Sequence, residues 1–211
     1  VEEEAVYGSD LYLYNRTAPV IWGAEGEFIS SQHLDDLQCG FAALKGFLQG
    51  NNPKNINVYA CFDNEEVGSS TKQGADSTFL ADVMERICMA CKKNPAEEFK
   101  KAVASSFMIS SDNAHAFHPN FSYKYDPVNR PHINRGIVIK FNGNQKYTSD
   151  AVSAAVVKEL CRRCNVPFQV YTNRSDIPGG STLGNISSSH VSLDSVDIGL
   201  AQLAMHSPYE T

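Results

Sequence analysis

The sequence lacks the features that define several common classes of protein. No apolar stretch approaches the ~20 residues of a membrane-spanning helix, and the opening residues, VEEEAVYGSD, have neither the basic start nor the apolar run of a signal peptide. Positive charge is not in excess, since 18 Lys and Arg face 24 Asp and Glu for a net charge of −6. These absences disfavour nucleic-acid and membrane partners, and we expect a cytoplasmic protein.

Internal repeats and low-complexity sequence are also missing, apart from a Gly/Ser-rich stretch at 175–189. Hydrophobic residues make up 42% of the chain and charged residues 20%, close to the average of globular proteins. A chain of 211 residues can bury one good-sized core, so we expect a single domain over 1–211. It begins at Val1 rather than Met, which processing, a missing start or an excised piece would each explain.

Strand and helix patterns alternate along the chain. The run INVYACF is continuously apolar, as in a strand that is covered on both faces. Helical periodicity is clear where apolar residues recur from Leu34 to Leu48. The expected strands are 11–14, 28–29, 56–62, 107–110, 137–141, 166–171 and 190–197, the helices 32–49, 76–93, 97–104 and 150–163, and the loops 119–135 and 175–189. Strands separated by helices favour parallel pairing, which predicts an α/β fold: a three-layer α/β/α sandwich with a mixed, largely parallel sheet.

Four of the six cysteines form two CxxC pairs, a spacing that is typical of zinc sites. Both pairs, Cys88/Cys91 and Cys161/Cys164, instead continue the apolar stripe of an expected helix, where this spacing suits two core-facing side chains. We therefore favour buried thiols, with a CxxC zinc-binding module as the alternative. Cys39 and Cys61 are also expected in the core.

Polar side chains gather where the expected strands end. DNEE at 63–66 follows one strand and DNAH at 112–115 another, Asp35-Asp36 opens a helix, and His206 follows an apolar stretch. In open α/β sheets, ligands bind beyond the carboxyl ends of the strands. Each cluster alone has an ordinary explanation, since surface acids are common. Together, the carboxylates would repel one another without a cation, and carboxylates with a histidine are the ligand types of a two-metal hydrolytic site.

Several motifs in this order resemble the aspartyl aminopeptidase family of metallo-aminopeptidases, which remove N-terminal residues from peptides. The motifs are LDDLQCG (34–40), DNEEVGS (63–69), SDNAHAFHPN (111–120), SDIPGGSTLGN (175–185) and AMHS (204–207). The resemblance extends from about Phe28 to His206. It implies a zinc aminopeptidase-like catalytic domain with two divalent metal ions, most simply zinc, with cobalt and manganese as alternatives.

The resemblance also implies a role for each matching residue. Asp35 would bridge the two metals, although Asp36 stands where the family often has Asn and is an alternative bridge. Glu65 would be the general base. The remaining metal ligands would be Glu66, Asp112 and His206.

Substrate contacts are implied for His115, Lys140 and Tyr147. Lys140 has a physical reason as well, because a cation at a strand end can hold a carboxylate or a developing oxyanion. The substrate would be a peptide with an acidic or neutral N-terminal residue, and the full-length protein a homo-oligomer. The turn in SDIPGGSTLGN suits close backbone approach and substrate contact. His118 is expected to position its loop, and His33, His132 and His190 have no expected role in the site.

The sequence departs from the family pattern in one respect. Family members carry a metal-binding His in an HxD segment upstream of the LDN turn and then an inserted dimerisation domain, and a terminal helix follows AMHS. None of these occurs between Val1 and Thr211. We therefore expect a catalytic domain that is incomplete at both ends, in which the metal bound through Asp35 and Asp112 lacks its histidine. A catalytically incomplete or degenerate fragment of the same fold is the alternative function.

Overall fold

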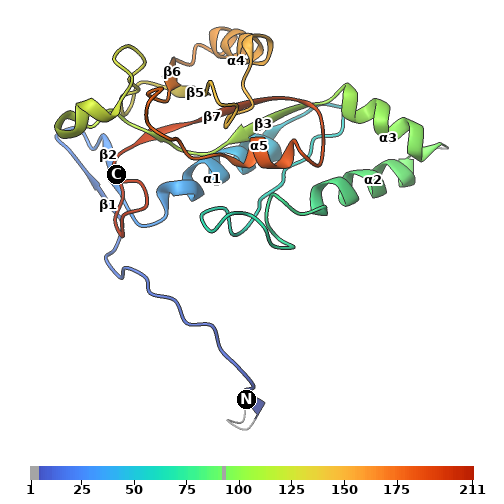
Figure 1. Cartoon of the computed structure of the whole chain (residues 1–211), viewed down its shortest axis with the longest axis horizontal. Helices are drawn as coiled ribbons and strands as arrows, with labels where there is room; N and C mark the ends of the chain where they lie inside the picture. Colours follow the sequence, from blue (N-terminus) through green and yellow to red (C-terminus); the bar gives the residue numbers. More distant parts are fainter. Residues whose placement is uncertain (1–4, 92–93) are drawn as a thin grey trace.

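The centre of the molecule is a five-stranded sheet with helices on both faces (Figure 1). The computed structural model describes residues 5–91 and 94–211. Four strands lie in the order β3-β7-β5-β6, and β4 pairs with β7. Their bounds are β3 Phe107–Ser111, β4 Ala114–His115, β5 Ile137–Phe141, β6 Phe168–Thr172 and β7 Asp194–Gln202.

The sheet is mixed but mostly parallel, as the sequence predicts. β7 pairs in parallel with β3 and β4, β5 pairs in parallel with β6, and only the β5–β7 pair is antiparallel. β7 begins and ends later than the predicted range 190–197, and Gln202 at its end pairs with His115. This register brings the segment before His206 alongside the segment that follows Asp112.

Helix α4, Ala151–Arg163, covers one face of the sheet (Figure 1). Its Val157 and Cys161 pack with Ile139 and Val196 of the strands. Asp150 caps the helix, because its side chain accepts a hydrogen bond from the Ser153 amide at 2.7 Å. One side of α4 is thus buried against the sheet, which explains why the apolar pattern predicts this helix correctly.

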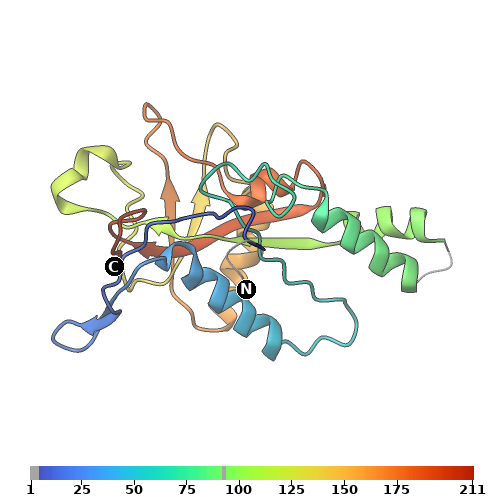
Figure 2. The same ribbon diagram turned by 90° about the horizontal axis from the view of Figure 1, so that it is seen from below.

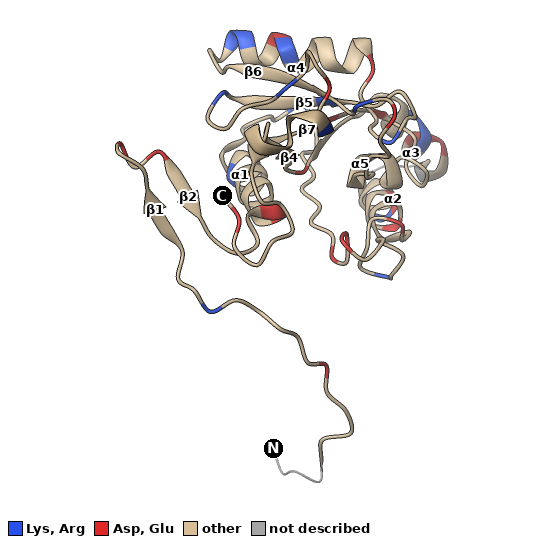
Figure 3. Cartoon of the chain, turned by 60° about the vertical axis from the view of Figure 1, so that its left-hand side comes forward, with Lys and Arg blue, Asp and Glu red and all other residues tan. Residues whose placement is uncertain are grey.

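Helices α1, Leu34–Gln49, and α5, Leu183–Ser187, lie on the opposite face (Figures 1 and 3). Val138 alternates with Ile139 along β5 and therefore points to this side, where it packs with Ala114, Tyr147 and Tyr171. Helices α2, Phe79–Cys91, and α3, Pro95–Ala104, form a pair at one end of the sheet. The prediction that α2 reaches Lys93 lies outside the described residues. No helix of the described chain is long and apolar enough to cross a membrane.

The N-terminal region contradicts one predicted strand. Residues 6–19 contain no helix or strand and extend away from the sheet (Figure 1). Leu11 and Leu13 are 89% and 104% exposed, so no described part of the chain buries these side chains. The two strands that follow, β1 Val20–Trp22 and β2 Phe28–Ser30, form an antiparallel pair.

The predicted buried strand at 56–62 is also wrong. These residues form no strand, and Figure 2 shows them in a loop beyond the end of α1. Ile56 is 63% exposed and Val58 46% exposed. An apolar run becomes a strand only when a neighbouring strand pairs with it, and no strand of the described residues does so here. Cys61, expected in the core, is exposed for the same reason.

The cysteine pairs are only half buried. Cys39, Cys88 and Cys161 are in the core, as predicted, but Cys91 and Cys164 are exposed. Cys91 is the last residue of α2, and Cys164 follows α4 as its C-cap. The two loops predicted at 119–135 and 175–189 each contain a short helix, η2 Pro119–Lys124 and α5.

Candidate metal centre

Two groups of side chains in the described part of the chain could each hold a cation. The histidine group is Asp35, Glu66 and His206, and the carboxylate group is Asp35, Asp36 and Asp112. Within each group the candidate ligand atoms all lie within 4.8 Å of one another. The structure thus brings together the four residues that the resemblance predicts as metal ligands, and Asp35 belongs to both groups.

Neither CxxC pair contributes to these groups. One member of each pair is buried and the other exposed. The described residues therefore give no support to a CxxC zinc module.

Asp35 and Asp36 lie at the start of α1, where the backbone is not yet helical. The prediction placed both in the first helical turn; the structure has φ −86° and ψ 113° at Asp35 and φ −116° and ψ 29° at Asp36. A residue next to the sheet holds the side chain of Asp36 in place: its Oδ1 accepts a hydrogen bond from the Asn113 amide at 3.0 Å. A residue between β3 and β4 thereby fixes the orientation of a side chain at the start of α1.

Asn113 is a site residue that the sequence interpretation left without a role. Its side chain is 2% exposed and donates from Nδ2 to the carbonyl of Leu34 at 2.9 Å, while its Oδ1 accepts from the thiol of Cys39 at 2.9 Å. It ties the end of β3 to the beginning of α1. The available signal was its position directly after Asp112, where an amide can satisfy backbone groups that neither element satisfies by itself.

Glu65 and Glu66 lie on a closed turn. The amide of Gly68 donates to the carbonyl of Glu65 at 3.0 Å, and that of Ser69 donates to Asn64 at 2.8 Å. Gly68 adopts φ 102°, a conformation that favours glycine, which explains the Gly of the DNEEVGS motif. The turn, rather than a strand end, presents the two carboxylates.

His206 connects the members of the histidine group. Its Nε2 lies 3.0 Å from Oδ2 of Asp35 and 3.0 Å from Oε2 of Glu66. The side chains of His206 and Glu66 are 58% and 53% exposed, whereas that of Asp35 is 3% exposed. An imidazole nitrogen together with carboxylate oxygens is a donor set that zinc accepts.

Negative charge is crowded around Asp35. Burial, followed by the nearby carboxylates of Asp112 and Glu66, raises the pKa of Asp35 to about 9. Burial and Asp112 raise the pKa of Asp36 to about 7. Such shifts mean that the ionised carboxylates lack sufficient positive charge around them.

The atoms of Asp35 show that a cation fits this position. Its Oδ2 faces His206, while its Oδ1 is buried without a hydrogen-bond partner. A buried carboxylate oxygen without a partner is unfavourable, and a bound cation would remove that cost. Asp35 thus offers an unpaired buried oxygen to a cation.

Lys140 lies against the carboxylate group. Only 2% of the residue is exposed, and its Nζ is 3.0 Å from Oδ2 of Asp112 and 5.5 Å from the ring centre of Tyr147. Burial, Asp112 and Asp197 raise the pKa of Tyr147 to about 12, so its phenol stays protonated near neutral pH. Lys140 and Tyr147 therefore lie beside the carboxylate group.

Glu65 and His115 have pKa values that suit proton transfer and hydrogen bonding. Burial, Asp112 and Glu66 raise the pKa of Glu65 to about 7, close to the value that favours a general base near neutral pH. Burial lowers the pKa of His115, and the charges of Lys140 and His206 lower it further. A lower pKa favours the neutral imidazole. His118 lies outside both groups and accepts a hydrogen bond from the Asn120 amide at 3.2 Å, a contact within the loop that it is predicted to position.

The Gly/Ser-rich loop at 175–189 approaches the sheet closely at Gly184. A Cβ at this position would lie 2.7 Å from the Cβ of Ser110, and the Gly184 amide donates to Ser110 Oγ at 3.0 Å. Thr182 donates from its hydroxyl to the buried carboxylate of Asp197 at 2.7 Å. The loop therefore approaches β3 closely at Gly184, which lies after the Pro-Gly-Gly turn, and the predicted substrate contact of that turn stays a prediction.

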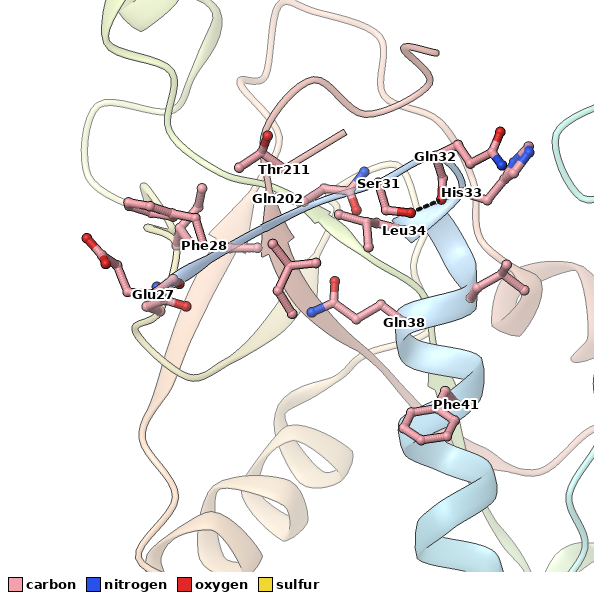
Figure 4. Close-up of a pocket in the computed structure, with 15 residues that line it drawn as sticks. Glu27, Phe28, Ser31, Gln32, His33, Leu34, Gln38, Phe41, Gln202 and Thr211 are labelled. Carbon is pink, nitrogen blue, oxygen red and sulfur yellow. Dashed lines mark hydrogen bonds between the residues drawn. The ribbon is translucent and has the colours of Figure 1, made fainter. Parts of the chain in front are cut away.

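A cavity of about 340 Å³ lies between β2, the start of α1 and the end of β7 (Figure 4). Phe28, Leu34 and Phe41 give it an apolar wall, and Gln38 and Gln202 add amides. None of the side chains in the two metal-binding groups lines it. The candidate metal centre is therefore separate from this cavity.

The site combines clustered carboxylates with a histidine on an α/β fold. This combination is typical of metal-dependent hydrolases. Comparison with known families agrees. Residues 1–211 match the family described as aminopeptidase I zinc metalloprotease (M18), and the chain belongs to this M18 family of zinc metallo-aminopeptidases.

Individual relatives support the same conclusion. The chain is 53% identical over 207 residues to a probable M18 family aminopeptidase 2 of Clostridium novyi, covering 98% of this chain and 48% of the relative. It is 39% identical over 212 residues to the aspartyl aminopeptidase of Caenorhabditis elegans, covering 98% and 44%. The chain thus spans about half the length of these relatives. The resemblance found in the motifs is confirmed.

Solved structures share the fold. An M18-family aminopeptidase from Thermotoga maritima superimposes with a TM-score of 0.83 at 27% identity, over 93% of this chain and 45% of that one. The Saccharomyces cerevisiae mApe1 dodecamer superimposes with a TM-score of 0.74 at 27% identity, over 93% and 44%. The mixed sheet and its covering helices are therefore an architecture shared with M18 enzymes.

Proposed function

We propose that this chain carries the metal-binding part of an aminopeptidase that hydrolyses the N-terminal residue, acidic or neutral, from peptides through two divalent metal ions. The observation that carries this proposal is the position of Asp35. It belongs to both groups of candidate ligands, and its buried Oδ1 has no hydrogen-bond partner. The proposed domain is a three-layer α/β/α sandwich that extends over the whole chain.

The ligands divide between the two ions. Asp35, Glu66 and His206 would hold one zinc ion, and Asp35 and Asp112 would hold the other, with Asp36 as a further ligand or alternative bridge. Among the described residues the carboxylate group contains no histidine. When bound, the metal ions would polarise the scissile carbonyl and lower the pKa of a water molecule from about 15.7 towards about 7.

Glu65 would carry the proton. Its pKa of about 7 allows the carboxylate to accept a proton from water at neutral pH and then to protonate the leaving amine. Glu66 is its neighbour on the turn and contacts His206, so the adjacent glutamates divide between base and ligand.

Three residues beside the ligands would bind the substrate. Lys140 provides a buried ammonium that can hold a carboxylate or a developing oxyanion once Asp112 binds a cation. Tyr147, with its pKa raised to about 12, and the neutral imidazole of His115 would provide hydrogen bonds. A buried cation favours an acidic N-terminal residue, and a neutral one remains the alternative substrate.

The whole protein would be a homo-oligomer and cytoplasmic. Support for oligomerisation comes from the similarity to the S. cerevisiae mApe1 dodecamer. The net charge of −6 supports the proposal that neither nucleic acid nor membrane is a partner, because both carry negative charge.

The test is to measure metal content and the release of N-terminal Asp, Glu and Leu from peptides by the intact protein, with and without chelator. We expect chelator-sensitive release that Glu65→Gln abolishes while metal content stays. Glu66→Ala should remove metal, whereas Cys91→Ser and Cys164→Ser should not. Activity that resists the chelator, or metal that depends on the cysteines, would overturn the proposal.

A further inference from the structure

Glu210 is a buried carboxylate close to the metal centre that has no assigned role. It is 2% exposed, although it lies four residues after the half-exposed His206. Glutamate is seldom fully buried unless its charge is hydrogen-bonded or paired. The contacts of Glu210 therefore need an explanation.

Both oxygens of this carboxylate accept hydrogen bonds from the backbone of proposed metal ligands. The amide of Asp35 donates to Oε2 at 2.9 Å, and the amide of His206 donates to Oε1 at 2.7 Å. One side chain thus joins two residues that are far apart in the sequence. Those same two residues approach each other at their side chains, where Nε2 of His206 is 3.0 Å from Oδ2 of Asp35.

The backbone of Glu210 is itself fixed to the strand that leads into α1. Its amide donates to the carbonyl of Ser31 at 2.7 Å, and the Ser31 amide donates to its carbonyl at 3.0 Å. Thr211 continues this attachment through hydrogen bonds with Leu203 in both directions. The hydroxyl groups of Ser30 and Thr211 are also 2.7 Å apart. The carboxylate therefore acts from a fixed position.

The segment that carries His206 needs such a support. Ala204 and His206 adopt φ values of 56° and 65°, in the left-handed region that non-glycine residues rarely occupy. His206 is the ligand with the most exposed side chain, and it lies on a turn. The Ser207 amide closes this turn on the carbonyl of Ala204 at 2.9 Å, and the bond from the His206 amide to Glu210 adds a second restraint at 2.7 Å.

We propose that Glu210 is a positioning residue that sets the separation of Asp35 and His206 and thereby preorganises the histidine group for its metal ion. This inference rests on the proposed function, because it requires a metal at that group. A carboxylate suits the role, since it offers two acceptor oxygens and no donor. Glutamine in its place would turn an N–H group towards one of the two amides.

The test compares zinc binding by the wild-type protein with that of Glu210→Gln and Glu210→Asp, using competition with a chelating dye. Loss of a group that hydrogen-bonds a metal ligand costs about 10- to 100-fold in affinity, and we expect Glu210→Gln to fall in this range. Glu210→Asp keeps the charge but is too short to reach both amides, so it too should lose affinity. Glu159→Gln on α4, where Glu159 pairs only with exposed arginines, is the matched control and should bind as the wild type does.

A cobalt-substituted sample gives a readout that a purely structural role would not change. We expect the visible absorption of bound cobalt in Glu210→Asp to shift from that of the wild type, because ligand geometry at the metal has altered. Wild-type affinity together with an unchanged cobalt spectrum in both variants would overturn the inference and leave the proposed function intact. Wild-type affinity in Glu210→Asp alone would reduce the role to charge and would also overturn it.

The amide protons provide a second measurement that needs no variant. In the wild-type protein the amide protons of Asp35 and His206 should exchange slowly with solvent, although the side chain of His206 is exposed. Fast exchange at both would contradict the inference. A wild-type protein that binds no metal at Asp35, Glu66 and His206 would overturn the proposed function itself and the inference with it.

Discussion

The histidine group and the carboxylate group share Asp35 but differ in donor type, burial and neighbouring charge. The histidine group combines an imidazole with carboxylates, and two of its side chains are more than half exposed. The carboxylate group has oxygen donors only, and Lys140 already pairs with one of its members at 3.0 Å. Zinc favours nitrogen donors, whereas all-oxygen sites suit harder cations. We therefore expect the histidine group to bind zinc more tightly.

The largest effect should come from Asp35→Asn, because this change acts on both groups. We expect loss of all bound metal, together with higher stability of the metal-free protein, since the buried charge at the centre of the cluster disappears. Metal content after dialysis and urea unfolding in the presence of chelator measure the two effects. Metal retained at the wild-type amount would show that Asp35 is not shared.

His206→Ala should separate the two groups. It removes the only nitrogen donor of the described ligand groups, so the tighter zinc site should be lost while the weaker one remains. We expect a drop in zinc affinity larger than the about 10- to 100-fold typical of groups that merely support a ligand. His190→Ala, which breaks a pair with Asp76 outside both groups, is the control. If the two variants lose zinc equally, the comparison between the groups fails.

The pH dependence of stability tests the crowding of carboxylates. Folding raises the pKa of Asp35 from 3.8 to about 9, that of Asp36 from 3.8 to about 7 and that of Glu65 from 4.5 to about 7. The folded state therefore binds more protons than the unfolded state between these values. Without metal, stability should fall as pH rises from about 4 to about 9.

Added zinc should reverse this trend, because the ion binds the ionised carboxylates and stabilises the folded state more as pH rises. Urea unfolding at a series of pH values, with zinc and with chelator, measures both curves. A metal-free protein whose stability increases over the same range would contradict the account.

The smallest effect concerns Lys140. Its positive charge lowers the pKa of Glu65 within the site, although burial and carboxylates dominate. Lys140→Met should therefore shift the acidic limb of the pH profile of kcat/KM to higher pH, because Glu65 must ionise to act as a base. Lys158→Met, on α4 beside Phe141, is the control. An unchanged limb would mean that Glu65 is not the base.

The sequence predicts a strand or helix correctly where the pattern of apolar residues within that segment matches its burial. Ile139 and Val157 show the alternation and periodicity of buried elements, and both lie in the core. Segments 11–14 and 56–62 have equally apolar patterns, but apolar character alone does not supply a pairing strand. Tertiary contacts, which local patterns do not contain, decide these cases.

Site residues were predictable to different degrees. Asp112 and His115 could be predicted from their positions near the end of a strand. Asp112 directly follows β3, and His115 lies in β4. Glu65 and Glu66 were identified by the motif, although the strand expected before them does not exist. Glu210 and Asn113 had no signal of comparable strength, because a buried acid or amide has the same sequence appearance as an exposed one. Their roles depend on hydrogen bonds between distant segments.

The most direct test of the shared-carboxylate account is a crystal structure of the zinc-loaded protein with anomalous difference maps. We predict two zinc peaks, one beside each oxygen of Asp35 and about 3.5–4 Å apart. The stronger peak should lie between Glu66 and His206. A single peak that Asp35 does not contact, or zinc at the cysteines, would contradict it.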